Sequence, residues 1–133
     1  MIKKMMNSDR SAVITIGGKE YQLILSTRAT KEIGKRYGGL ENLGDKLLKG
    51  ENFEMAMDEI TWLIVLFANQ SILAHNLQNP GDPKELLTEE MVDLLTTPME
   101  IASFKDAIMD AMMRGTNRHI ESEGVEGKNT EGG

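Results

Sequence analysis

The chain has no cysteine and few aromatic residues. Without cysteine among its 133 residues, neither a disulfide framework nor a thiolate metal site can form. Aromatic residues make up 5% of the chain, which leaves little for stacking on nucleic-acid bases. The longest apolar run, residues 62–68, is far shorter than the roughly 20 residues of a membrane span. We therefore expect a soluble protein that does not cross a membrane, and nucleic-acid binding has little support. The absence of cysteine fits a reducing cytosol.

Motifs that carry catalysis are also missing. No phosphate-binding GxxxxGK[ST] or GxGxxG pattern, zinc-binding HExxH pattern or nucleophile elbow occurs. His75 and His119 are far apart in sequence, and we interpret each as a solvated or capping histidine. The acidic groups at residues 58–59, 89–93 and 106–110 are expected to face water on helices. We expect no catalytic residue, no metal site and no cofactor.

Charge is unevenly distributed along the chain. The net charge is −6, but residues 1–50 carry ten basic and five acidic side chains, giving +5. Residues 51–133 carry the remaining five basic and sixteen acidic side chains, giving −11. Such polarity suits head-to-tail association or a partner with a charged surface. A solvated surface with chance asymmetry explains it equally well.

The length allows one domain with one modest core. We expect a mobile leader over residues 1–11, a single α+β domain over residues 12–118 and a disordered tail over residues 119–133. Glycine and glutamate dominate the end of the chain, which cannot bury enough apolar surface to offset its ordering entropy.

The first third of the chain predicts a β-hairpin followed by a capped helix. Apolar residues alternate on both sides of Gly17-Gly18, and this pair accepts the positive φ angles of a two-residue turn. Ser26 or Thr27 then caps a helix over residues 27–37, and Gly38-Gly39 ends it.

Apolar spacing predicts further helices along the rest of the chain. They cover residues 40–48, 53–76, 88–95 and about 98–115, with the third helix of the chain as the centre of the core. The predicted fold class is α+β: an N-terminal β-hairpin packed on a body of four to five helices, with a disordered acidic C-terminal tail.

Two surfaces are candidates for partner binding. Ten methionines in a small chain either fill gaps in a core or form an adaptable contact surface. The predicted contact surface is a face of the last helix, comprising Phe104, Ile108, Met109, Met112 and Met113. The second candidate is the hairpin edge, where another strand or another copy of the chain could add. Its predicted residues are Val13, Thr15, Tyr21 and Leu23.

The pattern Ile-x-Ile-Gly-Gly-Lys-x-Tyr-x-Leu, from Ile14 to Leu23, leads into a helix that ends Arg36-Tyr37-Gly38-Gly39. With the helical body and the polar tail, it resembles the tail assembly chaperones of long-tailed bacteriophages and prophages, over about residues 12–115. The resemblance implies a protein of the bacterial host cytoplasm that is not an enzyme. It also implies two partners, the long helical tape measure protein and the tail tube protein.

Two other functions fit the same sequence. One is a structural subunit of a phage tail or connector. The other is a small DNA-binding regulator in which the helices over residues 27–37 and 40–48 form a helix-turn-helix. The net positive charge of residues 1–50 supports this hypothesis.

Overall fold

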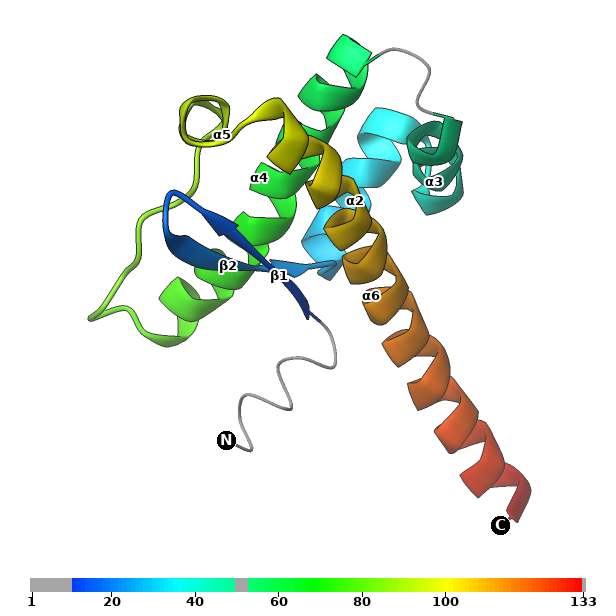
Figure 1. The fold of residues 1–133 in the computed structure, drawn as a ribbon. Coiled ribbons are helices and arrows are strands. Elements are labelled where there is room, and N and C mark those ends of the chain that lie inside the picture. The colour runs from blue at the N-terminus through cyan, green and yellow to red at the C-terminus, as the bar shows by residue number, and fades with distance from the viewer. Residues whose placement is uncertain (1–10, 50–52, 133) are drawn as a thin grey trace.

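The computed structural model describes the backbone of residues 11–49 and 53–132, together with their side chains except at residues 11, 48–49, 53–56 and 117–132. Two strands, β1 (Ser11–Ile16) and β2 (Lys19–Ile24), are followed by the helices α2 (Thr27–Tyr37), α3 (Leu40–Lys49), α4 (Phe53–Gln78), α5 (Glu89–Leu95) and α6 (Pro98–Gly132). Figure 1 shows the hairpin crossing α4, with α6 beside it. The predicted α+β class, with a hairpin packed on five helices, is confirmed. Of the predicted leader, residues 1–10 lie outside the described part.

The hairpin forms where the alternation predicts it. Gly17 and Gly18 take φ angles of +58° and +79°, the pair of positive values that a type I′ turn requires. The strands pair antiparallel in the register Ile16 with Lys19 and Ile14 with Tyr21. This turn matches the right-handed twist of the strands and therefore sets the register of the whole hairpin.

One face of the hairpin is buried and the other faces water. On β1 the buried side chains are Ala12, Ile14 and Ile16, whereas Val13 and Thr15 are exposed. The buried face lies on the helices, with β2 against α4 and both strands in contact with α6. An isolated hairpin is marginally stable in water, so this burial holds it in place.

The predicted start and end of α2 are confirmed. The Oγ atom of Ser26 accepts a hydrogen bond of 3.0 Å from the backbone N–H of Ala29, which satisfies one orphan donor of the first turn. Gly38 takes the left-handed conformation with φ of +88°, and its N–H bonds to Gly34 O at 2.9 Å. A turn of this kind lets α3 fold back beside α2.

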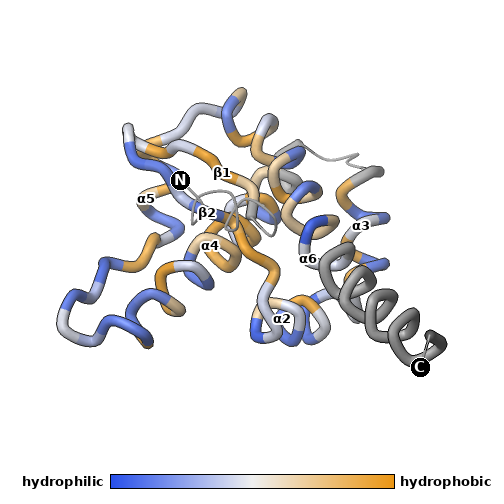
Figure 2. The backbone as a smooth tube through the Cα atoms, turned by 90° about the horizontal axis from the view of Figure 1, so that it is seen from below, coloured by the Kyte–Doolittle hydropathy of each residue, from blue (hydrophilic) through white to orange (hydrophobic). Residues whose placement is uncertain are grey.

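The central helix of the domain is α4. Leu63, Ile64 and Phe67 are fully buried, and β2, α2, α5 and α6 all contact the helix. In Figure 2 the hydrophobic segments converge where the strands cross α4, and the loop after it is hydrophilic. Residues Met57–Gln78 are long and apolar enough to cross a membrane. Here, however, their buried side chains form the centre of the core.

Two asparagines of α4 hold the chain segment that follows the helix. The side-chain amide of Asn69 donates to Leu87 O and its carbonyl accepts from Leu87 N, both at 2.8 Å. Asn76 makes the same pair of bonds with the backbone of Lys84, at 3.1 and 2.7 Å. The segment between them therefore runs back along α4. Sequence reasoning predicted only a loop here.

Replacing Asn69 by alanine is expected to lower the free energy of unfolding by about 1–3 kcal/mol, because it leaves the N–H and C=O of buried Leu87 without partners. Urea denaturation followed by circular dichroism measures the loss. Asn76→Ala is the matched control, since water can reach the exposed backbone of Lys84. Equal losses of unfolding free energy in the two variants would show that the burial of Leu87 does not cause the loss in Asn69→Ala.

The helix α6 is longer than predicted. Pro98 is its first residue, as expected, but its backbone continues to Gly132 instead of ending near Gly115. No proline follows Pro98, and a glycine inside a helix costs only about 1 kcal/mol, so the glycines do not stop it. The side chains of the predicted disordered tail, residues 119–133, lie outside the described ones, and its disorder stays a prediction.

Candidate functional site

The structure places most of the predicted contact face of α6 inside the core. Phe104, Ile108 and Met112 are buried, with exposed fractions of 7%, 0% and 8%. Met109 is partly buried, and only Met113 is exposed, at 59%. The interpretation of these residues as one open surface was wrong. Residues spaced four apart form a single stripe on a helix, and α6 has to use this stripe to cover α4 and the hairpin.

The predicted hairpin edge is divided in the same way. Tyr21 and Leu23 are buried, so their side chains are unable to meet a partner, and this part of the prediction was wrong. Val13 and Thr15 are exposed on β1. In a two-residue hairpin they occupy the positions whose backbone groups point away from the partner strand. Strand addition at β1 stays a prediction.

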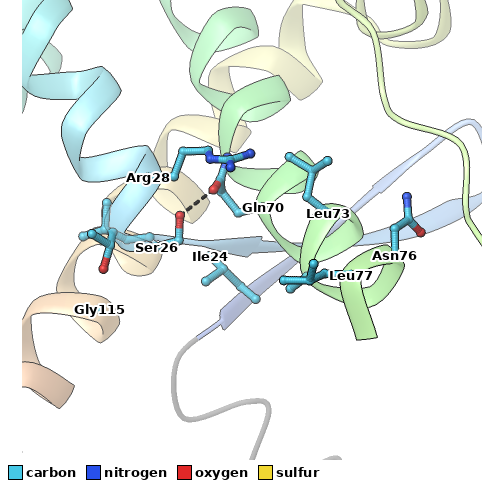
Figure 3. A pocket seen from close by; sticks show the side chains of 11 residues that line it. Ile24, Ser26, Arg28, Gln70, Leu73, Asn76, Leu77 and Gly115 are labelled. Carbon is cyan, nitrogen blue, oxygen red and sulfur yellow. Dashed lines mark hydrogen bonds between the residues drawn. The ribbon is translucent and has the colours of Figure 1, made fainter. Parts of the chain in front are cut away.

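A groove of about 790 Å³ opens where the end of β2 meets α2, α4 and α6. Its apolar wall consists of Ile24, Leu25, Leu73, Ala74 and Leu77. Leu77 is 85% exposed, the largest exposed fraction among the large hydrophobic side chains of the described residues. Figure 3 shows Leu73 and Leu77 on α4 at one side of the groove and Ser26 at the start of α2.

The polar side chains in the groove bond to one another. The hydroxyl of Ser26 donates to Gln70 Oε1 at 2.5 Å, and Gln70 Nε2 donates to Leu66 O at 3.1 Å (Figure 3). Gln70 is 8% exposed, so these bonds satisfy a buried amide. Because the same hydroxyl also accepts from Ala29 N, it joins α2 to α4. Affinity for a ligand in this groove would therefore come from its apolar wall.

The rim of the groove is positively charged. Arg28 lies exposed in the first turn of α2, and that turn carries no acidic side chain. Backbone N–H groups at a helix N-terminus add partial positive charge in the same place. A segment that offers apolar side chains next to a carboxylate would suit both features.

Gly115 allows α6 to pack closely enough to form one side of the groove. A Cβ atom at this position would lie 2.9 Å from Leu25 Cβ and 3.0 Å from Leu25 Cδ2, which is closer than side chains approach. The missing side chain thus allows α6 to pass directly beside the end of β2. The groove draws on residues 24–28, 70–77 and 115, which no local pattern connects, and sequence reasoning missed it.

A second polar cluster joins α2, α3 and α4. Glu59 accepts a hydrogen bond from the hydroxyl of Tyr37, forms a 2.9 Å ion pair with Lys46 and lies 3.4 Å from Arg36 Nε. The Arg36 guanidinium sits 4.3 Å from the centre of the Trp62 ring. Glu59 was expected to face water, but its side chain is only 15% exposed. The helices bring its partners together from three parts of the chain.

Protonation of Glu59 is expected to weaken the domain. Partial burial acts to raise the pKa of Glu59, but the hydrogen bonds from Tyr37 and Lys46 and the charges of Lys46 and Arg36 outweigh it, so the pKa is lowered. A lowered pKa stabilises the fold above the ordinary value of 4.5, and this stabilisation is lost as the pH falls below it.

Glu59→Gln should therefore cost about 1–2 kcal/mol at pH 7 and progressively less in acid. Urea denaturation of both proteins between pH 7 and pH 3 measures this difference. A cost that stays constant with pH would show that the charge of Glu59 contributes nothing.

The part of the chain that the structure describes holds no group of three or more His, Asp or Glu side chains placed to bind a metal ion. His75 Nε2 lies 3.0 Å from Asp82 O, so the ring bonds the loop after α4. The side chain of His119 lies outside the described ones. The acidic residues at 89, 90, 93 and 106 are exposed, and Asp110 pairs with Arg114 at 2.9 Å.

No family model, curated protein or solved structure matches the chain. Function is therefore inferred from the sequence patterns and from the surfaces described above.

Proposed function

We propose that the protein is a tail assembly chaperone of a long-tailed bacteriophage or prophage, which acts by binding and not by catalysis. Its clients are the tape measure protein and the tail tube protein, and it works in the cytoplasm of the bacterial host. Support comes from the resemblance of residues 14–23 and 36–39 to this class of protein. The apolar groove supplies a place for a client to bind.

The observation that carries the proposal is the apolar wall of this groove, in which Leu77 is exposed and Leu25, Leu73 and Ala74 are half-buried. A leucine that is 85% exposed adds nothing to the core, yet Leu77 lies in line with Leu73 one turn earlier on α4. Contiguous exposed apolar side chains with polar neighbours mark interaction sites in soluble proteins. Here the neighbours are Ser26, Gln70 and Asn76.

The apolar lining of the groove suits an amphipathic helix as the client segment. Grooves of this kind accept side chains at positions i, i+3 or i+4, and i+7 of an amphipathic helix. A long helical protein presents such positions repeatedly, and until it is covered its apolar stripe would drive aggregation. An acidic residue next to the stripe would meet Arg28 at the rim.

Changing Leu77 to aspartate is expected to weaken client binding about tenfold or more, which is the loss seen when an interface anchor is removed. Because Leu77 is 85% exposed, the variant should fold normally. Binding is measured by co-expression with the tape measure protein of the same phage, followed by affinity capture and titration. Leu86→Asp is the matched control, since Leu86 is exposed and lies outside the groove. Unchanged affinity in Leu77→Asp would remove the groove from the proposal.

The two other functions predict different results. A structural tail or connector subunit would remain in purified mature particles, whereas a chaperone leaves before the tail is complete. A DNA-binding regulator would bind duplex DNA with an affinity that falls steeply as salt rises. Mass spectrometry of particles and a binding titration at two salt concentrations separate these cases.

A further inference from the structure

The corner between α5 and α6 exposes three large apolar side chains. Leu94, Leu95 and Met99 are 74%, 51% and 81% exposed, and together they form what we call the corner patch. Its member Leu95 lies at the turn of the hairpin, where a Cβ atom on Gly17 would be 3.1 Å from Leu95 Cδ1. The corner patch shares no residue with the groove.

The corner is held by its own hydrogen bonds. The hydroxyl of Thr96 donates to Val92 O at 2.6 Å, at the end of α5. At the start of α6, Thr97 N donates to Glu100 Oε1 at 2.9 Å, and Glu100 N donates to Thr97 Oγ1 at 3.3 Å. This is a capping box, which fixes the entry into the helix. The apolar side chains are thus presented on a rigid frame.

The residues on either side of the corner patch in the sequence are rich in carboxylates. Between Lys84 and Lys105 the chain has five acidic residues and no basic one. All five are exposed: Glu85, Glu89, Glu90, Asp93 and Glu100. Such a surface repels an acidic partner and attracts a basic one. Its complement is a short segment that combines positive charge with apolar side chains.

The chain itself contains such a segment. Residues 1–10 include Lys3, Lys4 and Arg10 against a single acidic residue, and four of the ten are methionine or isoleucine. We propose that the corner patch binds residues 1–10 of a second copy, so that two copies exchange these segments and form a dimer. The exchange brings the basic residues 1–10 of each copy next to the acidic residues around the corner patch of the other.

The point of attachment favours a second copy over the same one. β1 starts at Ser11, which pairs with Ile24 at the end of the hairpin opposite the turn. Leu95 of the corner patch lies at the turn, about 17–20 Å away along a six-residue strand. To reach its own corner patch, the segment would have to reverse direction and recross the hairpin. A segment from another copy needs no reversal.

Sedimentation equilibrium of the full chain tests the proposal. We expect a dimer at low salt whose dissociation constant rises in 0.5 M salt, because screening weakens contacts between exposed charges. Lys3→Glu with Lys4→Glu should raise the dissociation constant about tenfold or more. Leu94→Ser with Met99→Ser should do the same while leaving the circular dichroism spectrum unchanged, since both side chains are more than 70% exposed.

The matched control is Lys31→Glu with Lys35→Glu, which makes the same change in net charge on exposed positions of α2. It should leave the dissociation constant within about twofold. Combining Lys3→Glu and Lys4→Glu with Glu90→Lys and Asp93→Lys should restore the dimer, because opposite charges again face each other.

Three results would overturn the proposal. A monomer at every concentration excludes the exchange and leaves only binding within one copy. A dimer unaffected by Leu94→Ser with Met99→Ser places the contact elsewhere, such as the β1 edge. Equal weakening by the control pair shows an effect of net charge alone. None of these results bears on client binding in the groove.

Discussion

Replacing Phe67 by alanine is expected to lower the free energy of unfolding by about 3–5 kcal/mol, a large part of the roughly 5–15 kcal/mol that holds a typical domain together. Phe67 is fully buried on α4, the helix that contacts the hairpin, α2, α5 and α6. Removing its ring forfeits the transfer free energy of the ring and leaves a cavity that several elements line. Urea denaturation followed by circular dichroism measures the loss.

Phe67→Leu is the matched control, because it keeps an apolar side chain of similar length in the same place. Its cost should be clearly smaller than that of Phe67→Ala, since less volume is lost. A loss below about 1 kcal/mol in Phe67→Ala would contradict the central place of α4, because surface substitutions have effects of about half that size.

Ile108→Asp is expected to unfold the domain. Ile108 is fully buried on the stripe of α6 that also contains Phe104 and Met112. An unpaired carboxylate at this depth either stays charged at a cost of several kcal/mol or takes up a proton, and in both cases it replaces apolar contacts with an unsatisfied polar group. We expect loss of the cooperative thermal transition and of soluble expression.

Met113→Asp is the matched control for this prediction. It adds the same carboxylate to the same helix, but at a position that is 59% exposed. Its effect on the free energy of unfolding should stay within about 0.5 kcal/mol. If Ile108→Asp folded as well as Met113→Asp, the buried stripe of α6 would be wrongly placed, and the predicted contact face would again be available to a partner.

Local chemistry made the N-terminal third predictable. Gly17-Gly18 accepts two positive φ angles, and alternation on either side then sets which residues pair. Ser26 and Gly38 mark the ends of α2 through bonds to residues three or four positions away. These signals depend on neighbours in sequence, so they can be read without the fold.

The end of α6 and the direction of its apolar stripe were harder to predict. Composition suggested that the helix would end near Gly115, but the backbone continues to Gly132. The stripe from Phe104 to Met112 was correctly seen as one face of a helix, but its burial was not foreseen. Periodicity shows that side chains share a face, and it does not distinguish a face that meets the core from one that meets a partner.

The sequence by itself determined the elements of this protein: a glycine-turned hairpin, capped helices, a central apolar helix and an uneven charge, because each depends on interactions over a few residues. The tertiary structure alone decided which apolar side chains stay outside. Leu77 and Met99 are exposed, whereas Met112 is buried, and the groove joins residues 24–28, 70–77 and 115. Exposure depends on which other elements cover a side chain, and local patterns in the sequence do not show which elements will meet.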